Sequence, residues 1–524
     1  MLLILLFAAI TLVFLYDVLI GPNIFLDRNP ARYDPWRAVA SASQLQSPSY
    51  WQDSFLTYLP RRTLLSQRMR NGEIPLWNPN ILAGAPFLAD PLTRVFYTIE
   101  LLLLLVEPAK AMGLDAPIHI LLAMLGMYLF LRSAGVSTEG AILGALTYAV
   151  SSFFYSRYGH PTPIASAAWI PFFFYGFELA WQSARLGTLG LAIFFAMGYL
   201  AGFLQVFLFG VCAVAFYGLY LSLAEKALRR RSLVRYLKIM VASRMISILI
   251  VSFQLISFVE YYFSSHGLHY PEDYVTTVFV TPPLVLLRSL LPMFFGNPVN
   301  GTDWSDLPRE LVHAYNPDFA VYCGIGTLVL ALVALGNPRR SPRLQLLSIL
   351  VIASTGVATN SYLLRLGYRL LPMSRASRLD RIAVIGGFAI ALMAASGLDC
   401  FKPTPWRTRN YLLVAIAITA GITLAVTLVL EFHGLAMIEH YANKLLSFPK
   451  QHWYRLANLS RSGRVKEWAQ TGQSARLALA STDGCTPDFA RTEKSPCQAE
   501  VACLGWDHSL DAGGRYSDSK GLLC

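Results

Sequence analysis

The chain has 524 residues, of which 55% are hydrophobic and only 14% are charged. A soluble domain usually carries about 25% charged residues, so this composition excludes a disordered or fibrous chain and favours a polytopic membrane protein over a soluble enzyme. The mean hydropathy of +0.47 agrees. We therefore interpret the net charge of +12 as basic cytoplasmic loops and contacts with anionic lipid or phosphate, not as a nucleic-acid surface.

Eleven apolar segments predict an all-α fold that crosses the membrane about eleven times. A helix needs about 20 mainly apolar residues to span the hydrocarbon. The first segment, residues 2–20, lacks the basic start and small-residue cleavage site of a signal peptide, so we expect it to be a retained span. The other segments lie near residues 115–133, 139–157, 164–182, 185–201, 203–224, 237–260, 317–336, 344–359, 382–398 and 411–432.

Basic residues in the short loops predict the orientation. The stretch 225–238 holds six Lys and Arg against one acid, and it falls on the cytoplasmic side if the N-terminus is cytoplasmic. The outer side then receives the first outer loop, residues 21–94, together with the loop 360–381. Residues 95–107 are apolar but too short to cross, so we interpret them as a re-entrant or interfacial helix.

The first outer loop has two parts of different character. Residues 54–70 mix apolar and basic side chains and predict an amphipathic helix on the membrane surface, interrupted near Pro60. Residues 75–91 contain four prolines and a glycine, which argue against a regular helix or strand. Since the residues between these breakers are apolar, we expect an irregular loop that packs on the helix bundle and lines a cavity.

Two kinds of charged residue on the outer side are candidates for chemistry. Asp53, just before the amphipathic stretch, is suited to accept a proton as a general base, or else to cap the helix that follows. Asp90 is a further candidate that turn or capping chemistry would also explain. The loop 360–381 carries five Arg against a single acid, which favours phosphate or carboxylate binding, although arginines at a membrane interface also snorkel.

Six short motifs follow one another along residues 1–432. They are Asn71-Gly72-Glu73-Ile74-Pro75, Gly159-His160-Pro161, Trp169-Ile170-Pro171, Pro292-Met293-Phe294-Phe295-Gly296, Tyr322-Cys323-Gly324 and Ser374-Arg375-Ala376-Ser377-Arg378. Their order resembles that of the YfhO-type bacterial membrane proteins, which belong to the GT-C class of glycosyltransferases. The resemblance implies transfer of a sugar from a polyprenyl-phosphate carrier to a cell-surface or cell-wall acceptor on the outer face of the bacterial cytoplasmic membrane.

The resemblance also implies roles for particular residues. Asp53 occupies the position of the catalytic base, and Arg375 and Arg378 the positions of cations that face the leaving phosphate. His160 is a candidate ligand of the phosphate or acceptor, or a structural hydrogen-bonding residue. Glu260 is a candidate for orienting sugar hydroxyls or for pairing with an arginine. Trp77 is a candidate for stacking on a sugar, although interfacial tryptophans are common. We predict no cofactor and no obligatory metal.

The C-terminal part departs from the family pattern. We divide the chain into a transmembrane GT-C-like domain (1–432), a helical outer segment (433–479) and a poorly structured tail (480–524) that is predicted to be extracytoplasmic. The resemblance implies that the chain is truncated at its C-terminus relative to the family. Two other functions therefore stay open, which are a transporter or flippase for lipid-linked sugars and a non-catalytic truncated family member.

Overall fold

The computed structural model describes residues 2–19, 38, 53–81, 83–224, 229–265, 283–291, 322–336, 342–359 and 379–401. All of them belong to the first of two units into which the chain divides, Met1–Tyr441. This part is helical, and five helices are long and apolar enough to cross a membrane, which confirms a multi-pass all-α membrane protein. These five are α6 (Pro108–Ser133), α9 (Pro161–Gln182), α11 (Leu204–Ala224), α12 (Arg229–Ser264) and α17 (Ala383–Phe401).

Shorter helices occupy most of the other predicted spans. The segments 411–432, 433–479 and 480–524 lie outside the described residues. The shorter elements are α1 (Leu2–Phe14), α2 (Tyr16–Leu19), α7 (Thr138–Ala149), α8 (Ser152–Tyr155), α10 (Ala184–Leu200), η6 (Pro283–Ser289), α14 (Ile325–Gly336), α15 (Pro342–Thr359) and η10 (Leu379–Ile382).

The predicted span 139–157 is not one helix, because α7 ends at Ala149 and α8 begins at Ser152. The break is stabilised by a residue far along the chain. The backbone N–H of Ser152 donates to the carbonyl of Tyr322 at 2.9 Å, and the backbone N–H of Tyr322 donates to Ser152 Oγ at 2.9 Å. An irregular backbone inside a membrane protein is stable where other protein groups satisfy it in this way.

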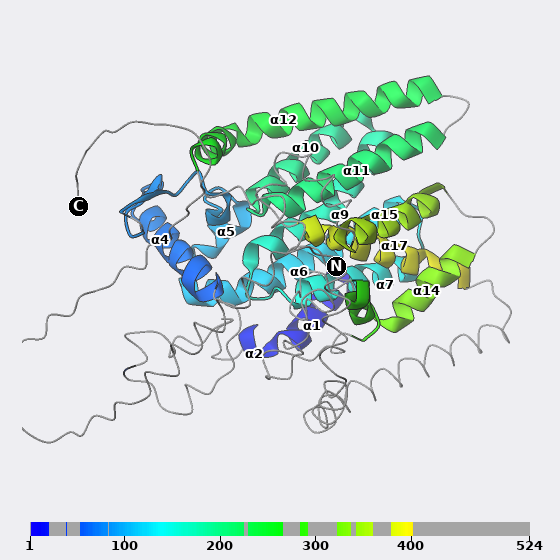
Figure 1. Cartoon of the computed structure of the whole chain (residues 1–524), viewed down its shortest axis with the longest axis horizontal. Helices are drawn as coiled ribbons and strands as arrows, with labels where there is room; N and C mark the ends of the chain where they lie inside the picture. The colour runs from blue at the N-terminus through cyan, green and yellow to red at the C-terminus, as the bar shows by residue number, and fades with distance from the viewer. Residues whose placement is uncertain are drawn as a thin grey trace, which may run out of the picture. The chain divides into compact units, whose positions relative to one another are not determined.

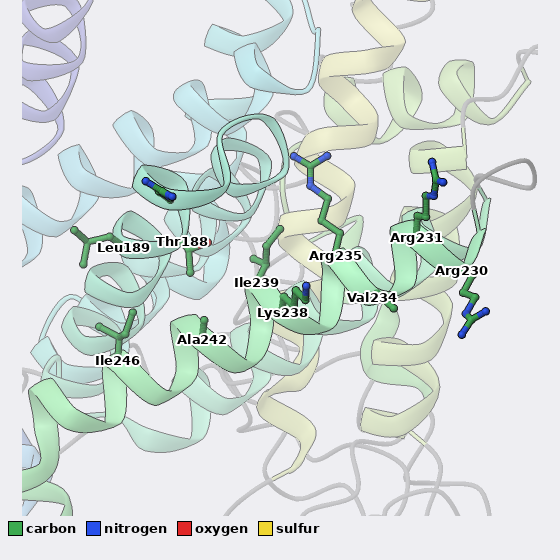
Figure 2. A pocket seen from close by; sticks show the side chains of 11 residues that line it. Thr188, Leu189, Arg230, Arg231, Val234, Arg235, Lys238, Ile239, Ala242 and Ile246 are labelled. Carbon is green, nitrogen blue, oxygen red and sulfur yellow. The ribbon is translucent and has the colours of Figure 1, made fainter.

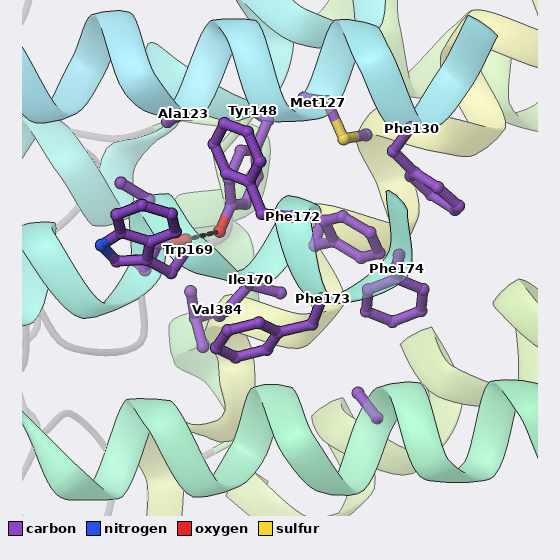
Figure 3. Close-up of a cluster of buried hydrophobic side chains, with 14 of the residues drawn as sticks. Ala123, Met127, Phe130, Tyr148, Trp169, Ile170, Phe172, Phe173, Phe174 and Val384 are labelled. Carbon is purple, nitrogen blue, oxygen red and sulfur yellow. Dashed lines mark hydrogen bonds between the residues drawn. The ribbon is translucent and has the colours of Figure 1, made fainter. Parts of the chain in front are cut away.

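An aromatic core holds the long helices together. Helix α9 packs against α6, α10 and α11, and α17 packs against α7, α14 and α15, while α10, α11 and α12 lie side by side (Figure 1). Phe174 of α9 lies 4.6 Å from Phe388 of α17 and 5.2 Å from Phe130 of α6, between ring centroids. Around them, the Tyr148 hydroxyl donates to the carbonyl of Ala167 at 2.8 Å (Figure 3). Three helices thus meet at one buried aromatic cluster.

Glycine permits the close approach of α17 to α14. A Cβ atom at Gly397 would overlap the carbonyl oxygen of Leu330, whereas one at Gly190 in α10 would meet nothing within 4 Å. We expect Gly397→Ala to destabilise the protein by about 1–3 kcal/mol through overpacking. Gly190→Ala should instead be neutral or stabilising by up to about 1 kcal/mol, since alanine favours helix. Thermal unfolding of the two variants tests this, and equal midpoints would contradict the packing role of Gly397.

The first outer loop contains a helix that changes its winding. Residues Ser54–Tyr58 form a π-helix, η3, and Leu59–Arg70 continue as α4, with Pro60 in the first turn of α4. The residue before the proline still bonds within the helix, since the backbone N–H of Leu59 donates to the carbonyl of Ser54, whereas Pro60 has no N–H to donate. The predicted interruption near Pro60 is therefore a change of helix type from η3 to α4.

The proline-rich part of this loop is irregular apart from one short ladder. Strands β1 (Trp77–Asn78) and β2 (Ala85–Pro86) pair antiparallel, and η4 (Pro91–Thr93) follows. Gly84 joins them with φ +115°, and a Cβ atom there would collide with the Trp77 indole. The predicted re-entrant or interfacial helix is shorter than residues 95–107, since α5 covers only Thr98–Leu103.

Contacts between loops group the described segments at two ends of the bundle. At the first end, the first outer loop contacts the turn before α9 and the C-terminal part of α12. At the same end, η10 contacts the start of α11. The contacts are Asp53 with His160, Leu88 with Gln254, and Gln205 with Arg381. At the second end, Ser137 bonds Asp399 and Trp181 bonds Arg235. This grouping matches the predicted sidedness; which end faces the cytoplasm stays a prediction.

Candidate functional site at the first end of the bundle

Asp53 and His160 face each other at the first end of the bundle, which is the predicted outer end. Asp53 immediately precedes η3, and His160 immediately precedes α9. One Asp53 carboxylate oxygen lies 3.8 Å from Nε2 of His160, and the Asp53 side chain is 57% exposed while that of His160 is 12% exposed. The Asp53 side chain makes no capping hydrogen bond. The Asp53 carboxylate is therefore accessible to a ligand, and the imidazole of His160 lies beside it.

Tyr58 connects this pair to α9. Its hydroxyl lies 2.9 Å from Oγ1 of Thr162, and its ring centroid lies 6.0 Å from that of His160. Burial raises the pKa of Tyr58 to about 12, with the Thr162 hydrogen bond and the charges of Arg381 and Arg61 acting against the rise. Tyr58 thus stays neutral and fixes the distance between η3 and α9.

The raised pKa of Tyr58 predicts a loss of stability in alkali. Between the ordinary value of 10.0 and about 12, the folded state keeps a proton that the unfolded state releases, so stability falls as pH rises through this range. The loss at high pH should amount to about 2–3 kcal/mol. In Tyr58→Phe the decline should be shallower by this amount, while at neutral pH the variant loses only the hydrogen bond, about 1 kcal/mol. Denaturation midpoints of both proteins at several pH values test this, and parallel declines would contradict it.

Two arginines, Arg61 and Arg381, lie near Tyr58, and the first of them pairs with an acid. Arg61 of α4 pairs with Asp90 at 2.7 Å, and Asp90 also accepts from the backbone N–H of Leu92 at 3.0 Å. Burial raises the pKa of Asp90, and the positive charge of Arg61 opposes that rise. Arg381 of η10 contacts Oε1 of Gln205 at 3.3 Å and is close enough to lower the pKa of Tyr58. The last arginine of the loop 360–381 therefore lies at the same end as Asp53.

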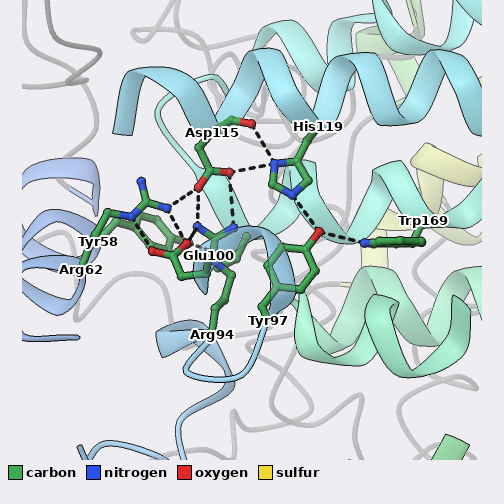
Figure 4. Close-up of polar contacts among 9 residues, drawn as sticks. Tyr58, Arg62, Arg94, Tyr97, Glu100, Asp115, His119 and Trp169 are labelled. Atoms are coloured by element: carbon green, nitrogen blue, oxygen red, sulfur yellow. Dashed lines mark hydrogen bonds and ion pairs between the residues drawn. The ribbon is translucent and has the colours of Figure 1, made fainter. Parts of the chain in front are cut away.

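A buried group of four charges anchors the helix that follows Asp53. Arg62 of α4 donates to Oε1 of Glu100 in α5 at 2.7 Å and also binds Asp115 of α6. Arg94 binds the same two carboxylates. All four side chains are at most 5% exposed, and Figure 4 shows them converging from four segments. Two positive and two negative charges balance, so the group is neutral as a whole.

These charges hold one another in place. Burial alone would lower the pKa of Arg94, but Asp115 and Glu100 outweigh burial and raise it; the same two carboxylates raise the pKa of Arg62. Both arginines therefore stay charged. Because an unpaired buried charge is strongly unfavourable, all four groups must be present for α4, α5 and α6 to pack as observed.

A chain of hydrogen bonds extends this group toward α9. The indole N–H of Trp169 donates to the Tyr97 hydroxyl at 2.8 Å, and that hydroxyl lies 2.8 Å from Nε2 of His119. The other ring nitrogen of His119, Nδ1, lies 2.9 Å from a carboxylate oxygen of Asp115. Indole only donates, so the Tyr97 oxygen accepts from Trp169, and its contact with Nε2 of His119 continues the chain to Asp115.

Sequence reasoning missed this buried group, although one signal was present. Asp115 and His119 lie within the predicted span 115–133, and an ionisable residue inside a span is a functional or structural candidate by default. Their partners Arg62 and Arg94 come from the first outer loop, which looked like an ordinary basic surface. Only the fold brings the opposite charges together.

The remaining predicted site residues are Trp77, Asp90, Glu260, Arg375 and Arg378. Trp77 is 53% exposed and covers Gly84, and Asp90 has the pairing and capping contacts given above. Glu260 is exposed near the end of α12, and among the described residues no contact joins it to Asp53. Arg375 and Arg378 lie outside the described residues. Their roles in binding substrate stay predictions.

The arrangement at the first end of the bundle suits proton transfer beside a bound anion. An exposed carboxylate can accept a proton from a hydroxyl, and His160 can hold or pass that proton. Arg381 adds positive charge at the same end. Within the described ranges, no three His, Cys, Asp or Glu residues cluster as metal ligands; the predicted absence of an obligatory metal stays a prediction.

No protein-family model and no curated protein matches the chain. Among solved structures, a cryo-EM structure of the arabinofuranosyltransferase AftD from mycobacteria matches with a TM-score of 0.46 and 14% identity, over 82% of this chain and 27% of that one. The match thus spans about a quarter of the larger protein. A likeness of this degree carries no conclusion about activity.

Proposed function

We propose that the protein is a membrane glycosyltransferase of the GT-C kind, which moves a sugar from a polyprenyl-phosphate carrier to a surface or cell-wall acceptor at the outer face of the cytoplasmic membrane. The observation that carries the proposal is the pair Asp53 and His160, 3.8 Å apart at the end of the bundle where the first outer loop lies. The resemblance of the sequence motifs to the YfhO-type proteins supports the same reaction.

In this reaction Asp53 acts as the general base. The acceptor hydroxyl attacks the anomeric carbon, its proton passes to the Asp53 carboxylate, and the bond from the anomeric carbon to the carrier phosphate breaks. His160 is proposed to orient the carboxylate and share the proton; their separation of 3.8 Å is within ion-pair range but longer than a hydrogen bond. The exposure of Asp53 supports this role, since a reacting hydroxyl must reach it.

Arginines stabilise the phosphate that leaves. Negative charge grows on the carrier phosphate as its bond to the sugar breaks, and fixed cations nearby lower the energy of that transition state. Arg381 is proposed to contribute because it lies next to Tyr58 on the same side as Asp53. Arg375 and Arg378 are proposed to contribute on the strength of the motif resemblance.

A vesicle assay separates this proposal from a transporter or flippase. The purified protein is reconstituted with a polyprenyl-phosphate donor whose sugar is labelled, and both transfer of label to an added glycan acceptor and movement of the intact donor between leaflets are measured. We expect transfer that depends on protein and acceptor. Movement of intact donor without transfer would instead support the flippase.

A further inference from the structure

A second charged region lies at the opposite end of the bundle from Asp53. Helix α9 begins beside His160 and ends at Gln182, so its 22 residues separate the two ends by about 30 Å at 1.5 Å per residue. That is about the thickness of the hydrocarbon core. At the far end the Arg235 side chain binds the carbonyl of Trp181 and lies 5.2 Å from its ring centroid. The two regions therefore belong to opposite membrane interfaces.

A cavity of about 860 Å³ opens here between α10 and α12. Its basic lining comes from both helices: Arg185 at the start of α10, and Arg230, Arg231, Arg235 and Lys238 along the first turns of α12. Among the described residues no acid lines it, and no carboxylate there pairs with these five side chains. Such a concentration of cations attracts an anion with more than one charge.

Apart from Thr188, the rest of the cavity wall is aliphatic. Beyond Arg235, the lining residues Ile239, Ala242 and Ile246 follow at intervals of four, three and four, which is one face of α12 (Figure 2). From Arg231 to Ile246 this face extends about 22 Å along the helix. Leu189 of α10 lines the cavity as well. The surface thus changes along the helix from cationic to apolar, as an amphiphile with an anionic head would require.

We propose that this cavity binds an anionic phospholipid, with the headgroup phosphate on the basic side chains and the acyl chains along the aliphatic face of α12. A lipid with two phosphates is favoured because the cations spread over two turns of α12 and face others from α10. The predicted orientation puts this end at the cytoplasmic leaflet, where anionic lipids attract basic segments. The bound lipid joins α10 to α12 and is separate from the sugar donor proposed for the outer end.

Matched charge variants test the site. Native mass spectrometry of the purified full chain, titrated with cardiolipin or with phosphatidylcholine, measures binding to the wild type, to Arg231→Gln and to Arg229→Gln. Arg231 lines the cavity, whereas Arg229, also exposed and on the same helix end, does not. We expect cardiolipin to bind the wild type in preference to phosphatidylcholine. Arg231→Gln should weaken it about fivefold, and the triple change Arg185→Gln, Arg231→Gln, Lys238→Gln on the order of 100-fold.

Several results would overturn the proposal. Equal weakening by Arg229→Gln would reduce the effect to general surface charge. Displacement of cardiolipin by millimolar inorganic phosphate would show a site for free phosphate and no role for the acyl chains. Equal or tighter binding of a polyprenyl phosphate would assign the cavity to the carrier lipid. Because these measurements need no sugar transfer, their outcome is independent of the proposed enzymatic function.

Discussion

The variant Asp53→Asn should lose nearly all sugar transfer while it folds as the wild type does. An amide cannot accept the proton of the attacking hydroxyl, and general base catalysis contributes about 100- to 10,000-fold to a rate. Because the Asp53 side chain is 57% exposed and makes no capping hydrogen bond, the substitution should change the unfolding midpoint little. Initial rates of transfer from the lipid-linked donor, together with thermal unfolding of the same samples, provide the measurement.

Glu73→Gln is the matched control for this experiment. Glu73 lies in the same outer loop, is exposed, and pairs with Arg68 on the surface, so its neutralisation should leave transfer unchanged. Wild-type transfer by a folded Asp53→Asn protein would remove Asp53 from the mechanism. A similar loss in Glu73→Gln would show that any change of charge in the loop impairs transfer.

The second large effect is expected at the buried charge group. Asp115→Asn leaves Arg62 and Arg94 facing Glu100 alone, with one uncompensated positive charge in a buried site. Breaking a buried ion group by removing one partner destabilises a protein by about 3–5 kcal/mol. The detergent-solubilised variant should therefore unfold at a much lower temperature than the wild type, and its transfer rate should fall because α4 no longer holds the Asp53 end of η3.

A compensating change separates charge from packing. Arg94→Gln combined with Asp115→Asn restores neutrality, so the double variant should be more stable than Asp115→Asn alone. Neutralisation of the exposed pair through Glu73→Gln should change stability by no more than about 1 kcal/mol. If the double variant is less stable than both single variants by the sum of their effects, the four charges do not act as one group.

Features that depend on local sequence could be predicted, whereas features that depend on contacts between distant residues could not. Apolar runs of about 20 residues predicted the long helices, because length and hydropathy alone decide whether a helix can span a membrane. The break between α7 and α8 was not predictable in the same way, since it is stabilised by Tyr322, far along the chain.

The same distinction applies to the candidate site, where some residues could be predicted from the sequence and their arrangement could not. Asp53 and His160 were both candidates from their loop positions, but their spacing of 3.8 Å depends on the packing of η3 against α9. The group of Arg62, Arg94 and Asp115 was missed because its members come from a surface loop and a span, and each alone looks ordinary.

A double-mutant cycle on the transfer rate tests most directly the central claim that Asp53 and His160 form one site. The rates of the wild type, Asp53→Asn, His160→Gln and the combined variant are measured under single-turnover conditions. If His160 acts through the Asp53 carboxylate, His160→Gln alone slows transfer and the combined variant is no slower than Asp53→Asn. Two losses that multiply in the combined variant, or a His160→Gln protein as fast as the wild type, would contradict the account.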